Sequence, residues 1–133
     1  MKKWTLMGVG IFLLVVVLLA VFFLPKGGLS GTYQREDGGM GFKLVLEESG
    51  TFKDYFENFP SKTLTEQASG DWKLVDEEVH LSYQTPADYA KRGLIHIFRV
   101  QEDGSLSQIA GIADGKRHEL SKEQQAEILD WMK

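Results

Sequence analysis

The sequence predicts a mainly β protein, with one N-terminal transmembrane helix, an antiparallel up-and-down meander that closes into a barrel, and a short C-terminal helix. Three observations support this prediction. Residues 5–24 are 20 consecutive positions without a charge. Apolar and polar residues then alternate with a period of two, which is typical of strands that bury one face. Asp-Gly pairs interrupt this alternation and favour tight turns.

The uncharged run is long enough to cross a membrane, because a helix of that length measures about 30 Å. Lys2 and Lys3 precede it and favour a cytoplasmic N-terminus. A cleaved signal peptide is the alternative, but its apolar core is ordinarily only ~7–15 residues long. We therefore expect residues 1–28 to form an anchor and linker in the inner (plasma) membrane, and residues 29–133 to form a periplasmic or extracellular domain.

The alternation begins after the linker. Phe42, Leu44 and Leu46 occupy every second position, and similar patterns follow along the chain. A glycine stands two residues before an aromatic residue in three places, where it permits the turn or bulge that starts a strand. Seven or eight short strands are expected, among them residues 42–47, 52–57, 71–74, 79–84, 94–100 and 106–112. The stretch 94–100 is more continuously apolar than the other strands, which predicts a strand covered on both faces.

Two segments break the strand pattern and predict helices. Residues 85–93 combine a threonine cap, a proline at the first helical position and a final glycine, which is typical of a helix of one to two turns. Ser121 and Gln124 fit a capping box, and Ala126, Leu129 and Met132 follow at helical spacing. We therefore expect a C-terminal helix over 121–132 that packs on the outside or across one end of the sheet.

Composition excludes several function classes. The chain has no cysteine, which rules out disulfides, thiol catalysis and zinc–cysteine sites. All 19 acidic residues but only 12 of the 15 basic ones lie beyond position 29, so this part carries a net charge of −7. Nucleic acid is therefore not an expected partner, because its phosphates would repel such a domain.

The sequence predicts no enzyme, cofactor or metal site. It contains no Gly-x-Ser-x-Gly nucleophile elbow and no phosphate-binding glycine loop, and an uncharacterised hydrolase is the weaker alternative. His80 lies near the acidic run 76–78, but no two histidines have the short spacing of metal ligands. His96 belongs to the most apolar strand, which favours a histidine of the core or barrel lining.

The glycine–aromatic motifs and the strand rhythm resemble small bacterial lipocalin-like barrels. The likeness covers residues 30–120 and is nearest to the N-terminal barrel of the copper-resistance, envelope-stress outer-membrane lipoproteins. It implies a location in the cell envelope and a role in binding or sensing. That family carries a lipidated cysteine and a Cys-x-x-Cys pair, so its copper handling and lipid anchor do not transfer to this chain. The residues that carry the likeness are Gly31-Thr32-Tyr33, Leu44-Val45-Leu46, Gly50-Thr51-Phe52, Gly70-Asp71-Trp72, Val79-His80-Leu81 and Asp103-Gly104-Ser105-Leu106.

Two functions are expected from these features. The first is a membrane-anchored, non-enzymatic envelope module that binds another protein, as an accessory subunit, assembly factor or immunity-type protein. Its candidate contact residues are apolar side chains in expected loops: Met40, Phe59 and Tyr89. The alternative is a barrel that binds a small apolar ligand. Its candidate cavity-lining residues are Tyr33, Phe52, Trp72, Tyr83, His96 and Phe98.

Overall fold

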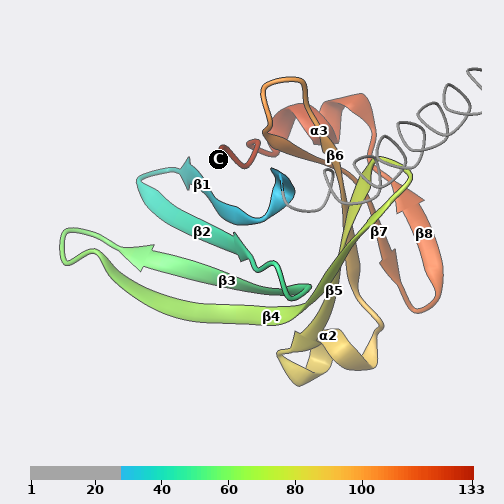
Figure 1. Cartoon of the computed structure of the whole chain (residues 1–133), viewed down its shortest axis with the longest axis horizontal. Coiled ribbons are helices and arrows are strands. Elements are labelled where there is room, and N and C mark those ends of the chain that lie inside the picture. Colours follow the sequence, from blue (N-terminus) through green and yellow to red (C-terminus); the bar gives the residue numbers. More distant parts are fainter. Residues whose placement is uncertain (1–27) are drawn as a thin grey trace, which may run out of the picture.

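The computed structural model describes residues 28–133, which form a single eight-stranded antiparallel sheet with two short helices (Figure 1). The strands follow one another in sequence order, so the predicted up-and-down meander is confirmed. The elements are β1 (Gly31–Asp37), β2 (Met40–Leu46), β3 (Thr51–Asn58), β4 (Thr63–Val75), β5 (Glu78–Thr85), α2 (Ala87–Lys91), β6 (Ile95–Val100), β7 (Leu106–Ala113), β8 (Lys116–Glu119) and α3 (Lys122–Glu127).

The predicted membrane anchor lies outside the described residues, apart from residue 28. Among residues 28–133, no helix combines the length and the apolar character needed to span a membrane.

The sheet curls into a half-barrel, and its first and seventh strands are linked by the C-terminal residues (Figure 1). Trp131 exchanges two backbone hydrogen bonds of 2.9 Å with Leu106 on β7. Met132 exchanges two with Gln34 on β1, at 2.6 and 2.9 Å. Because successive residues of an extended chain present their amide and carbonyl groups to opposite sides, two residues are enough to join both strands.

The alternating apolar residues fill the concave side of the sheet. Tyr33 faces Leu44 across β1 and β2, and Leu46 faces Phe52 across β2 and β3. Each of these side chains is at most 1% exposed. The Tyr33 hydroxyl donates a hydrogen bond of 2.6 Å to the Leu29 carbonyl, so this buried polar group keeps a partner.

Gly70 allows β4 and β5 to approach closely at a β-bulge. A Cβ atom added to Gly70 would lie only 1.9 Å from the carbonyl oxygen of Ser82. The strand register shifts at this point, between Ser69 and Gly70. The motif Gly70-Asp71-Trp72 therefore needs its glycine for space, as the predicted role in a bulge requires.

Strand β6 is covered on both faces, as its continuous apolar character predicts. Phe98 belongs to the main core, whereas its neighbour Ile97 belongs to a second cluster with Ile109 and Ala110. Ile97 and Phe98 are 0% and 3% exposed.

The two predicted helices differ in how closely they match the structure. Helix α2 confirms the short helix expected within residues 85–93, but the expected threonine cap is wrong: Pro86 is the N-cap, the helix begins at Ala87, and no side chain caps it. Helix α3 has the predicted capping box, with Ser121 Oγ accepting from the Gln124 amide, but it ends at Glu127 instead of continuing to residue 132. The chain becomes extended at Ile128 and carries Trp131 into the core, where it is only 5% exposed. Burying this large side chain and linking two strands outweighs a few more helical residues, which are marginal in so short a helix.

Candidate functional site

The interior of the half-barrel contains a cluster of polar side chains around a cavity of about 80 Å³. The polar members come from five different strands: Arg35 (β1), Asp54 (β3), Tyr83 (β5), His96 (β6) and Gln108 (β7). Apolar side chains complete the wall, namely those of Leu44, Leu81, Phe98 and Trp131. Alternation explains this placement, because each polar residue occupies an inward-facing position of its strand.

Arg35 is held between two aromatic rings. Its guanidinium carbon lies 5.0 Å from the centre of the Phe42 ring and 4.6 Å from that of Trp131. Both separations are within cation–π range, so the C-terminal segment helps to fix this charge. The Nε atom of Arg35 is buried and has no hydrogen-bond partner in the part of the chain that the structure describes.

Asp54 faces the same cavity from β3, just before a shift in the β3–β4 register. Its Oδ1 atom is buried and, among the described residues, has no hydrogen-bond partner. Burial raises the pKa of Asp54 to about 6, although the charge of Arg35 partly opposes this change. The two opposite charges therefore influence one another across the cavity without joining in an ion pair.

Tyr83 and His96 form a hydrogen-bonded pair beside these charges. The Tyr83 hydroxyl lies 3.0 Å from Nδ1 of His96, and the two rings pack edge to face at 4.9 Å. Burial, with a smaller contribution from Arg35, lowers the pKa of His96 to about 4. Burial is also the main cause of the raised pKa of Tyr83. Both side chains are therefore neutral near pH 7, and proton transfer from Tyr83 to His96 is unfavourable.

A second feature is an apolar surface at the ends of two neighbouring hairpins, which we call the hairpin-end surface (Met40, Phe59 and Leu64). These side chains are 48%, 48% and 44% exposed. A Cβ atom added to Gly41 would lie 2.9 Å from Cε2 of Phe59, so the Phe59 ring covers the backbone next to Met40. Leu64 and Gly41 both face Glu57 in the strand register, which places the two hairpin ends together.

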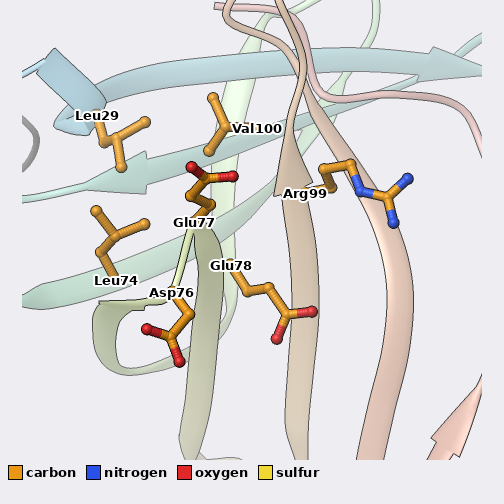
Figure 2. Close-up of a pocket in the computed structure, with 7 residues that line it drawn as sticks. All are labelled: Leu29, Leu74, Asp76, Glu77, Glu78, Arg99 and Val100. Carbon is orange, nitrogen blue, oxygen red and sulfur yellow. The ribbon is translucent and has the colours of Figure 1, made fainter.

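A third feature is an open pocket of about 580 Å³ near the turn between β4 and β5 (Figure 2). Leu29, Leu74 and Val100 form its apolar part, whereas Asp76 and Glu77 project from the turn. The pocket also borders Glu78 and Arg99, but the Glu78 carboxylate is already paired with Arg117, at 3.2 Å, and with His80, at 3.5 Å. Within residues 28–133, no group of three or more histidine and acidic side chains is arranged to hold a metal ion.

The candidate cavity-lining residues separate into two sets. Tyr83, His96 and Phe98 line the interior cavity, whereas Tyr33, Phe52 and Trp72 are packed in the core and do not line it. The Nε1 atom of Trp72 donates a hydrogen bond of 2.7 Å to the Glu47 carbonyl.

The candidate contact residues also separate. Met40 begins β2 instead of lying in a loop, whereas Phe59 lies in the turn between β3 and β4. Phe59 covers the face of the sheet that Gly41 presents, and Met40, the preceding residue, belongs to the opposite face. Tyr89 is on α2, where its ring packs edge to face on Tyr83 at 5.5 Å. Tyr89 is 42% exposed.

Sequence reasoning missed Arg35 and Asp54 as site residues. A signal was present, because Asp54 stands midway between Phe52 and Phe56 and therefore shares their face of the strand. Arg35 likewise lies two residues after the buried Tyr33. A charged residue in the apolar phase of an alternating pattern indicates a buried polar site.

No protein-family model, curated protein or solved structure matches this chain.

Proposed function

We propose that the protein is a membrane-anchored, non-enzymatic module of the cell envelope that binds another protein through its hairpin-end surface. The observation that carries this proposal is the presence of three large, half-exposed apolar side chains at one end of the sheet: Met40, Phe59 and Leu64. Large apolar side chains that are exposed at the ends of hairpins are typical of protein-binding sites. The anchor and the placement of the domain outside the inner membrane rest on residues 1–28 of the sequence, and the likeness to lipocalin-like envelope barrels rests on the sequence motifs.

The surroundings of this surface favour a basic partner. Glu36, Asp37 and Glu66 are exposed near the hairpin ends, and the segment beyond position 29 carries an excess of negative charge. A partner with an apolar centre and a basic rim would complement both features. Complementary charge raises the rate of association, and this gain declines as salt increases.

The interior supports this proposal over a barrel that binds an apolar ligand. Pockets for such ligands ordinarily enclose at least ~300 Å³ and are mostly apolar. The interior cavity of residues 28–133 measures about 80 Å³ and is lined by five polar side chains. The open pocket beside β4 and β5 is larger, but two carboxylates from its turn face solvent there.

The polar cluster also favours binding over catalysis. A raised tyrosine pKa beside a lowered histidine pKa makes Tyr83 a poor nucleophile and His96 a poor base toward it.

Site-specific photo-crosslinking in native membranes tests the proposal. A photoreactive amino acid at Phe59 should capture one defined envelope protein, and the yield should fall as salt is raised. The matched control carries the same amino acid at Lys116, an exposed position on β8. Equal capture at both positions, or capture of lipid alone at Phe59, would contradict the proposal.

A further inference from the structure

Two opposite charges face the interior cavity without meeting. Arg35 presents a buried Nε–H group and Asp54 presents a buried Oδ1 atom, and neither atom has a hydrogen-bond partner among residues 28–133. Both residues line the cavity. Buried polar atoms without hydrogen-bond partners are costly, so sites of this kind are ordinarily completed by a bound polar molecule.

The size of the cavity limits what can bind. Its volume of about 80 Å³ compares with the ~30 Å³ that a water molecule occupies in the liquid. It therefore has room for two or three waters, or for one molecule of about five non-hydrogen atoms. Leu44, Leu81 and Phe98 close the apolar sides, which excludes a guest with a long side chain.

The charges define the chemistry of the guest. An anion alone would satisfy Arg35 but would be repelled by Asp54, and a cation alone would have the opposite conflict. A guest with both charges satisfies both residues. His96 is neutral near pH 7 and does not repel a cationic group, while Tyr83 and Gln108 offer further polar contacts.

We propose that this cavity binds a small zwitterion of the size of glycine, with its carboxylate toward Arg35 and its ammonium group toward Asp54. The site is separate from the hairpin-end surface, so this proposal does not depend on the protein-binding function. Trp131 forms one wall of the cavity and packs on Arg35, which makes the C-terminal segment part of the site.

Calorimetry and carbon-13 NMR with labelled glycine test the proposal on the full chain. Glycine should bind near pH 7, whereas acetate and methylammonium, which carry one charge each, should bind at least about tenfold more weakly. Leucine should not bind, because its side chain exceeds the cavity. Absence of binding at roughly 100 mM glycine, which would saturate even a millimolar site, means that the cavity holds water only and overturns the proposal. Equal binding of leucine also overturns it.

Variants locate the binding to this cavity. Asp54→Asn should weaken glycine binding about tenfold or more, because a charge-assisted contact is lost. Asp37→Asn is the matched control, since it removes the same charge from an exposed turn in which Asn-Gly is equally suited. Unchanged binding in Asp54→Asn contradicts the proposal.

The wild-type protein provides a second test that needs no variant. Glycine stays zwitterionic between about pH 7 and pH 5, whereas Asp54 gains a proton over this range, since its pKa is about 6. Tyr83 and His96, the other cavity-lining groups besides Arg35, stay mostly neutral over this range, because the pKa of Tyr83 is raised and that of His96 is lowered to about 4. Binding should therefore weaken on acidification, and pH-independent binding contradicts the role of Asp54.

Discussion

Replacing Asp54 with asparagine should stabilise the unliganded protein at neutral pH. Burial raises the pKa of Asp54 from 3.8 to about 6. At ~1.4 kcal/mol per pKa unit, the ionised carboxylate lowers the free energy of unfolding by about 3 kcal/mol above pH 6. Asparagine has nearly the same shape and stays neutral, so the variant avoids this loss.

The sign of the pH dependence makes the test specific. Between about pH 4 and pH 6 the folded state binds more protons at Asp54 than the unfolded state does. The stability associated with protonated Asp54 is therefore fully present below pH 3.8 and is lost as the pH rises through 6. The advantage of the variant should therefore be about 3 kcal/mol near pH 7.5 and close to zero below pH 4.

His96 acts in the opposite direction. Its pKa falls from 6.5 to about 4, so the stability that it contributes is present above pH 6.5 and is lost as the pH falls toward 4. In the wild-type protein, acidification removes the stability contributed by His96 but also relieves the cost of the Asp54 charge, so the two effects offset one another. In Asp54→Asn only the loss at His96 remains. The variant should be more stable at neutral pH and more sensitive to acid.

The assay is guanidinium unfolding of the intact chain followed by circular dichroism at several pH values, with Asp37→Asn as the exposed-charge control. A difference between Asp54→Asn and wild type that does not change with pH, or a variant that is less stable near pH 7.5, would refute the reasoning about burial.

Three further predictions concern the fold and are measured by the same unfolding experiments. Trp131→Ala should cost about 3–5 kcal/mol, because it removes a buried aromatic side chain that packs on Arg35; a loss below ~1 kcal/mol would show that the strand link does not depend on this residue. Gly70→Ala should cost about 3 kcal/mol or more, since its Cβ would clash with a backbone oxygen, whereas Gly111→Ala, whose Cβ would lie 3.6 Å from the nearest such atom, should change stability by less than ~1 kcal/mol. Ser121→Ala should cost about 1 kcal/mol through loss of the capping box at α3, and an unchanged midpoint would show that α3 adds nothing to global stability.

Local sequence patterns were sufficient to predict most of the sheet. The alternation at Phe42, Leu44 and Leu46 identifies the inward face of β2, because a strand repeats every two residues. The apolar stretch around Ile97 and Phe98 predicts coverage on both faces, and the structure places these two residues in different clusters. Both features depend only on neighbours in the sequence.

The C-terminus and the polar cluster could not be predicted in this way. Trp131 fits a helical stripe in the sequence, but it pairs with Leu106 because the curled sheet needs a partner there. Arg35 and Asp54 come from strands that are not adjacent, so their approach depends on how strongly the sheet curls. Long-range pairing of this kind overrides local propensity.

The link between β1 and β7 also has a consequence for the order in which the protein matures during synthesis. Gln34 is among the first residues of the described chain to leave the ribosome, and Met132 is among the last. Until Met132 emerges, the exposed backbone of β1 lacks this partner and is open to pairing with other nascent chains. A chaperone that shields the β1 edge would therefore be of most use before Met132 emerges.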